Sequence, residues 1–284
     1  MFQLSRSLRL CLPLCLMASA CDVKVGEKGV SLNVASEQAS DTWQRSYSLP
    51  ANGRLELSSV SGVVQITGTS GSQAEVTIVR EATAMTKDDA RQSVAGVSIT
   101  EDAKPDAVRI EVRADREHRG RLTLRTTLAV PRGLIVSVRN QDGRIELENV
   151  DGRITAAVAN GPITGRGVSG SLSASVVNGR LSIDLNPSFD NVDLAATNGA
   201  VRVGIPAEAS ADLQLEALNG GVTVDPRLNL ASKDAAAAGG DGEFFSKRVT
   251  GRLKDGGPKL VARAINGAVR VGLPGDDLER RGRR

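Results

Sequence analysis

The stretch that decides the fold comprises residues 142–179, which read DGRIELENVDGRITAAVANGPITGRGVSGSLSASVVNG. Five of its glycines stand nine residues apart, at positions 143, 152, 161, 170 and 179. Most of them follow Asn or Asp, and Asn-Gly and Asp-Gly are turn dipeptides because these residues tolerate positive φ. Between the glycines, aliphatic and polar residues alternate, as they do in a half-buried strand. The stretch therefore predicts short β-strands separated by regular turns.

The same pattern occurs on both sides of this stretch. Aliphatic residues stand two and four positions after most of the glycines, and the residue between them is polar. Gly165 stands where one of these aliphatic residues is expected, so we expect the cross-section of the core to narrow there. Segments 198–206 (NGAVRVGIP) and 266–274 (NGAVRVGLP) are nearly identical. A fixed period with a fixed phase is typical of a repeat array. The predicted turn glycines are Gly53, Gly62, Gly143, Gly152, Gly161, Gly170, Gly179, Gly199, Gly220 and Gly267.

Two all-β arrangements fit the repeat. If each Asn-Gly is a corner, the strands stack in parallel as a β-solenoid with two short strands in each coil of about 18–21 residues. If each is a tight reversal, the strands form an antiparallel meander. Only 2% of the residues are aromatic, which suits the thin interior of a solenoid built from valine, isoleucine and leucine. The sequence therefore favours the parallel β-helix-like solenoid.

Residues 81–139 do not follow the nine-residue spacing. Residues 86–94 could form a turn or two of helix, and 131–133 form a turn. Longer alternating segments, which predict an antiparallel sheet flanking the solenoid, occupy residues 97–100, 107–113, 121–130 and 134–138. Residues 231–245 are rich in glycine and alanine and are predicted to be an inserted loop.

The N-terminus resembles an export signal. Residues 1–20 carry Arg6 and Arg9, a short apolar run and the small residues 18–20, and Cys21 follows. This order resembles a bacterial lipobox, after which the cysteine is acylated. Ala18 stands where leucine is commonest, so ordinary cleavage that leaves a free Cys21 is the alternative. Acylation would anchor the chain stably to a membrane. The sequence thus predicts a membrane-anchored lipoprotein of the cell envelope, facing the periplasm or the exterior.

The chain then divides into four segments. A signal peptide at 1–20 is followed by a polar tether at 21–45, which would link the lipid to the folded body. The β-strand repeat domain spans 46–274. A basic tail at 275–284 contains four arginines, and we expect it to be a solvated end.

Three segments carry a family resemblance, namely residues 128–165, the segment VNGRLSIDL that follows them, and the closing segment GPKLVARAINGAVRVGLP. Their sequence pattern resembles the bacterial putative-adhesin family of β-strand repeat proteins, domain of unknown function 4097. The resemblance covers roughly residues 46–274. It implies a secreted or envelope-anchored solenoid. It defines no catalytic residue, and the insertion at 231–245 and the arginine tail depart from the family pattern.

Composition excludes most catalytic chemistry. The net charge of +3 is too small to indicate nucleic-acid binding. All three cysteines lie in the first 21 residues and His118 is the only histidine, so a Cys/His zinc site cannot be built from the mature chain. His118 sits among charged residues and is expected to be an exposed loop side chain. We therefore predict no catalytic residue, no cofactor and no metal.

Weaker motifs have plainer explanations. Residues 165–170 fit GxGxxG, but a strand is expected after them where a nucleotide site needs a helix. Residues 239–242 resemble one copy of a calcium-binding glycine/aspartate loop, and Asp142 and Asp151 are expected to be turn residues. The outward acids of the repeats are isolated, namely Glu146, Glu148 and Asp184.

The sequence favours a non-enzymatic envelope protein that presents a polar surface rich in Ser, Thr and Arg. Its partners would be the membrane, through the lipid anchor, and an envelope protein or polysaccharide. Two alternatives stay open: a signalling partner of a membrane regulator in envelope-stress sensing, and a polysaccharide-active β-helix enzyme, which would need paired carboxylates.

Overall fold

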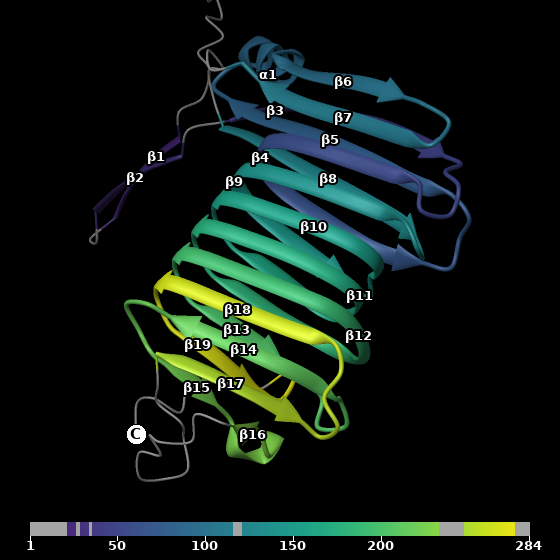
Figure 1. Cartoon of the computed structure of the whole chain (residues 1–284). Coiled ribbons are helices and arrows are strands. Elements are labelled where there is room, and N and C mark those ends of the chain that lie inside the picture. The colour runs from purple at the N-terminus through teal and green to yellow at the C-terminus, as the bar shows by residue number, and fades with distance from the viewer. Residues whose placement is uncertain (1–21, 27–28, 34–35, 116–120, 233–246, 276–284) are drawn as a thin grey trace, which may run out of the picture.

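The computed structural model describes residues 22–26, 29–33, 36–115, 121–232 and 247–275 (Figure 1). Within these ranges the chain is all-β apart from the helix α1 (Lys87–Ala95) and the 3-10 turn η1 (Pro226–Leu228). The strands are β1 (Asp22–Gly26), β2 (Gly29–Asn33), β3 (Glu37–Tyr47), β4 (Arg54–Thr69), β5 (Ala74–Ala84), β6 (Val97–Ala103), β7 (Ala107–Ala114), β8 (Arg121–Pro131), β9 (Ile135–Glu148), β10 (Asp151–Asn160), β11 (Ile163–Asn178), β12 (Leu181–Asn198), β13 (Val201–Gly204), β14 (Ala211–Ala217), β15 (Val222–Val224), β16 (Ala231–Ser232), β17 (Arg248–Leu253), β18 (Lys259–Asn266) and β19 (Val269–Gly272).

β1 and β2 form a separate antiparallel pair, and the remaining strands belong to one large mixed sheet. β4, β9, β11 and β12 are long, and the two halves of each pair with different neighbours. The sheet therefore consists of two rows of strands joined at corners, as Figure 1 shows. Ladder A is the row β6–β7–β4–β9–β10–β11–β12–β18–β14–β17–β16, and ladder B is the row β3–β5–β8–β4–β9–β11–β12–β13–β19–β15.

The repeat strands pair in parallel and in phase. In ladder B, Ile145 pairs with Ile163 and Ile163 with Leu181, so each step advances 18 residues. The next step, from Leu181 to Val201, advances 20 residues. The glycine spacing therefore correctly predicted the register, because every second turn of the repeat returns to the same corner. The antiparallel-meander alternative for these strands is wrong.

The last coil of the sequence does not lie last in the stack. β18 pairs in parallel with β12 on one side and β14 on the other, and β19 lies in the same way between β13 and β15. Figure 1 shows these yellow strands between green ones that precede them in the chain. As a result, the two near-identical segments stack directly, with Val201 opposite Val269 and Arg202 opposite Arg270.

One aliphatic core runs between the ladders. Its members are the inward residues of both rows, and Phe189 is the only buried aromatic ring among the described residues. The core has no gap at Gly165. A Cβ built on this glycine would meet Ile183 Cδ1 at 2.9 Å and Val168 Cγ2 at 3.1 Å. The expected narrowing at Gly165 is therefore offset, because these two side chains occupy the space that its missing side chain leaves.

The N-terminal end departs from the sequence-based picture in two ways. The flanking strands form a mixed sheet, since β7 and β8 pair in parallel with β4 while β6, β5 and β3 pair antiparallel with their neighbours. The sheet also begins at Glu37, inside the stretch expected to be tether. β3 was missed because it is an edge strand whose residues are mostly exposed on both faces, so its sequence does not alternate. α1 follows Thr86, which caps it by accepting a hydrogen bond from Asp89 N.

Candidate binding surface

An asparagine ladder runs along one corner of the stack, where ladder A turns into ladder B. Each side-chain amide donates a hydrogen bond to the side-chain oxygen of the coil before it, at 2.7 to 2.8 Å. The order of the ladder, from the final acceptor to the first donor, is Asp142, Asn160, Asn178, Asn198, Asn266 and Asn219. Because all five bonds point the same way, they end on the carboxylate of Asp142, which sequence analysis assigned to a turn.

The glycines after these residues bring successive coils into close contact. Gly161 adopts φ +134°, and a Cβ built on it would collide with the carbonyl oxygen of Gly143. A side chain at this position would therefore push apart the two coils that the asparagine ladder joins. The same column contains Gly62, Gly143, Gly179, Gly199, Gly267 and Gly220.

The remaining predicted turn glycines lie elsewhere. Gly152 and Gly170 stack at the opposite corner, where a Cβ on Gly170 would collide with Gly152. Gly53 follows Asn52, which has φ 65°, and donates a backbone hydrogen bond to Pro50 O at 2.8 Å. Apart from Gly53, the predicted glycines therefore lie in two columns, a grouping that follows from parallel stacking.

An aromatic cluster closes the N-terminal end of the stack. Tyr47 donates a hydrogen bond to Glu101 Oε1 at 2.9 Å, and Arg45 lies 3.5 Å from the other oxygen of Glu101. The Arg45 guanidinium also lies 5.0 Å from the centroid of the Trp43 ring. Burial, followed by the hydrogen bond and negative charge of Glu101, raises the pKa of Tyr47 well above its ordinary value. The chain's single Trp and single Tyr therefore serve as an end cap and lie outside the repeats.

Two acids of ladder B are held by arginines. Glu146 lies 2.7 Å from Arg144, and Asp184 lies 2.9 Å from Arg202 in a pair that is mostly shielded from solvent. Arg202 also donates to Ser182 Oγ at 3.2 Å. A carboxylate that is ion-paired in this way has a structural role and is poorly placed to act as a general acid or base.

The outer face of ladder A carries cations that no described carboxylate pairs. From β7 to β17 its outward positions carry nine basic side chains and five ion-paired acids: Glu56 with Arg109, Glu111 with Arg113, Asp193 with Arg263, Asp212 with Arg252 and Glu216 with Arg248. Two further exposed acids of these strands, Asp151 and Asp190, have no ion-pair partner within the described residues. Within the described part of the chain, no carboxylate pairs with Arg54, Arg139, Arg153 or Lys259. Four positive charges therefore remain available on this face.

A groove of about 670 Å³ lies in the middle of this face. Its floor carries the hydroxyls of Thr155, Ser171 and Ser173, which project outward from β10 and β11. Arg153 lies on one side, and Lys259 lies on the other, two strands beyond β11. We call this the hydroxyl groove. Its volume is in the range of small-molecule and oligomer-binding sites.

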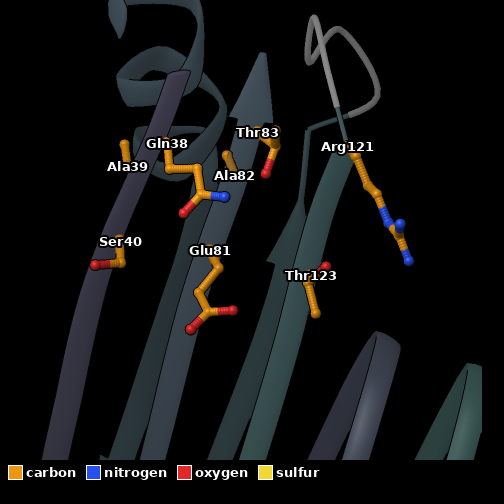
Figure 2. A pocket seen from close by; sticks show the side chains of 8 residues that line it. All are labelled: Gln38, Ala39, Ser40, Glu81, Ala82, Thr83, Arg121 and Thr123. Atoms are coloured by element: carbon orange, nitrogen blue, oxygen red, sulfur yellow. The ribbon is translucent and has the colours of Figure 1, made fainter. Parts of the chain in front are cut away.

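Two smaller hollows differ in character. One of about 350 Å³ lies at the asparagine corner of ladder A, and its lining combines apolar residues such as Val60 and Val177 with serines, Arg139 and Glu111. The other, of about 310 Å³, lies across β3, β5 and β8 (Figure 2). In Figure 2 its Arg121 side chain extends away from Glu81, and these two residues carry its only charges. Of these three hollows the hydroxyl groove has the largest volume, and it is the one lined by two cations, Arg153 and Lys259, that no carboxylate pairs within the described residues.

Several predicted features lie outside the described residues, namely Cys21 with the signal peptide, His118, the glycine/aspartate loop at 239–242 and most of the tail. The GxGxxG residues lie inside strand β11, so the helix that a nucleotide site needs does not follow them. Among the described residues there is no group of three or more metal-binding side chains. No described helix is long and apolar enough to cross a membrane.

No protein-family model matches the chain, and no curated protein matches it. Among solved structures, a "putative cell adhesion protein" from Clostridium sporogenes covers 82% of this chain and 100% of its own, at 12% identity and a TM-score of 0.42. A "putative adhesin" from Bacteroides fragilis covers 81% and 97%, at 10% identity and a TM-score of 0.28. One from Parabacteroides merdae covers 82% and 96%, at 9% identity and a TM-score of 0.24. Their names agree with the resemblance found in the sequence, but likeness at this level carries no functional argument. Membership of the family stays a prediction.

Proposed function

We propose that the chain is a non-enzymatic, lipid-anchored protein of the bacterial cell envelope. Its stacked coils would form an adhesin-like β-solenoid that presents the outer face of ladder A to another envelope component. The observation that carries this proposal is the state of the outward side chains. Five acids on that face are held by arginines, whereas the hydroxyls of the hydroxyl groove, with Arg153 and Lys259, are left to meet a partner. Such a surface is suited to binding through many weak polar contacts.

The proposed location rests on the N-terminal sequence. Acylation of Cys21 would place the body close to a membrane, joined through the residues that precede β3. Metabolic labelling with palmitate tests this part. The wild type is expected to incorporate label and Cys21→Ser is expected not to, because the thiol is the acceptor. Label in both, or in neither, would refute the anchor.

The surface role can be tested by site-directed crosslinking in intact cells. Cys11 and Cys15 would be lost with the signal peptide and Cys21 would be acylated, so an introduced cysteine would be the one free thiol able to carry a photo-crosslinker. Ser173→Cys places the probe in the hydroxyl groove, and Thr164→Cys places it on ladder B. We expect an envelope protein or polysaccharide to be captured from position 173 and not from 164. Capture from neither position would overturn the proposal.

The enzymatic alternative is tested directly. Oligosaccharide release from envelope polysaccharide by the purified protein, lost on Glu146→Gln or Asp184→Asn, would replace the non-enzymatic proposal. We expect no release, because each of these carboxylates already has an arginine within ion-pair distance.

A further inference from the structure

We propose that the hydroxyl groove binds an extended strand of an anionic polysaccharide. This inference rests on the proposed surface function and names the class of ligand. It derives from the spacing of the two groove cations, the hydroxyls between them and the pairing of the nearby acids.

The two cations occupy equivalent positions on different strands. Ile154, Leu172, Val192 and Leu260 form one buried row across four strands of ladder A. Arg153 directly precedes the first member of this row, and Lys259 directly precedes the last. Neighbouring strands lie about 4.8 Å apart, so the two residues stand about 14 Å apart across the strands. A ligand that contacts both must therefore lie across the strands and carry more than one negative charge.

The floor between the cations suits a sugar strand. Ser171 and Ser173 project from β11, between the strands of Arg153 and Lys259, and Thr155 projects from β10 beside Arg153, so the groove floor offers three hydroxyls. Each hydroxyl can donate one hydrogen bond and accept others, which matches the hydroxyls of a carbohydrate. Their side chains are small, which leaves the groove open. An arginine is also suited to pair with a carboxylate, sulfate or phosphate group through its forked donors.

The acids near the groove do not cancel this charge. Asp193 lines the groove, but its carboxylate lies 3.6 Å from Arg263. Asp151, two residues before Arg153, and Asp190 and Asp255 are exposed acids close in sequence to the lining, yet none of the three lines the groove. No carboxylate pairs with Arg153 or Lys259 within the residues that the structure describes. The groove therefore favours an anionic ligand over a neutral or cationic one.

Binding of the purified full chain in detergent to soluble polymers tests the proposal. We expect polygalacturonate or dextran sulfate, the carboxylated and sulfated probes, to bind, and their relative affinity indicates which anion the groove prefers. Neutral dextran should bind much more weakly. Affinity for the anionic probe should fall with added salt, because exposed ion pairs are screened.

Matched variants separate the groove from the overall charge of the face. Arg153→Gln with Lys259→Gln should raise the Kd by about 3- to 30-fold, the range expected for losing two exposed ion pairs. Arg54→Gln with Arg139→Gln removes two charges from the same face outside the groove and should change the Kd by less than about 2-fold. Ser173→Ala should weaken binding of the sugar polymer and leave binding of inorganic polyphosphate unchanged. Circular dichroism of each variant checks that the fold is retained.

Three outcomes would overturn the inference: equal loss in the two double variants, equal binding of neutral dextran, or no binding of any anionic polysaccharide. In each case crosslinking from position 173 in cells still decides the proposed function separately. Capture there of a protein or a neutral polymer would leave the surface role standing and remove the anionic ligand. Failure of capture would remove both.

Discussion

Replacement of Asn178 by alanine tests whether the asparagine ladder stabilises the stack. Asn178 donates to Asn160 and accepts from Asn198, each at 2.8 Å, so the variant loses two hydrogen bonds. A protein hydrogen bond contributes about 0.5–1.5 kcal/mol net. Because these amides are exposed, the lower half of that range applies. We therefore expect Asn178→Ala to lower the free energy of unfolding by about 1–2 kcal/mol.

The end of the ladder provides the matched control. Asn219 makes only one ladder bond, to Asn266 at 2.8 Å, so Asn219→Ala should cost about half as much, 0.5–1 kcal/mol. Ser175→Ala replaces an exposed residue of the same strand as Asn178 and should be close to neutral. Urea unfolding followed by far-ultraviolet circular dichroism measures all three variants against the wild type.

The comparison between the two asparagine variants decides whether the ladder hydrogen bonds stabilise the stack. If Asn178→Ala costs no more than Asn219→Ala, the ladder bonds do not add along the corner, and its stability comes from the backbone alone. If both are neutral, water replaces the side-chain bonds without loss.

Three further predictions concern packing and ionisation. Gly161→Ala should destabilise the fold by more than about 3 kcal/mol or prevent folding. Gly133 has φ +79° and open space around it, so Gly133→Ala should cost only about 1–2 kcal/mol of backbone strain. Equal melting temperatures of the two variants would contradict this prediction. Gly165→Ala should lower the free energy of unfolding by about 1–3 kcal/mol, and Ile183→Val should lower it by about 0.5–1.5 kcal/mol. The double variant should lose less than the sum of the two, because valine lacks the Cδ1 that the new methyl group would meet at 2.9 Å. Additive losses in urea unfolding would refute this contact. Because its pKa is raised in the folded state, the neutral form of Tyr47 stabilises the fold fully below about pH 10, and this contribution is lost as the pH rises through the folded-state pKa. Tyrosinate absorbance of this single tyrosine should rise only well above pH 10 in the folded protein, and a midpoint near the ordinary value would count against the hydrogen bond from Tyr47 to Glu101.

The sequence predicted those features that depend on one coil at a time. Alternation fixed which residues face the core, and the glycines marked corners, because both follow from local backbone geometry. The side-chain ladder from Asn219 to Asp142 was not predicted, since turn dipeptides reveal donors and acceptors only after the coils are stacked. β3 was missed because a strand exposed on both faces has no alternation to detect.

The candidate groove could not be read from the sequence for a different reason. Arg153 and Lys259 are more than a hundred residues apart in the chain, and they share a groove only because β18 pairs beside β12. Coils with the same phase can all pair with one another, so a periodic pattern leaves their spatial order undetermined. The near-identity of segments 198–206 and 266–274 indicated that these coils are compatible, and it did not indicate that they are neighbours.

That order of coils has a consequence for how the protein is made. During synthesis, and during any export from the N-terminus, residues 211–253 emerge before the coil at 259–272 that separates them from β12 and β13. Until that coil arrives, either the edges of β12 and β13 stay unpaired or β14 and β15 occupy them in its place. Completion of the stack therefore has to wait for nearly the whole chain, and an early β12–β14 contact must be released before the native one can form. Nascent chains that stop before residue 259 should consequently expose a sheet edge and be prone to aggregation.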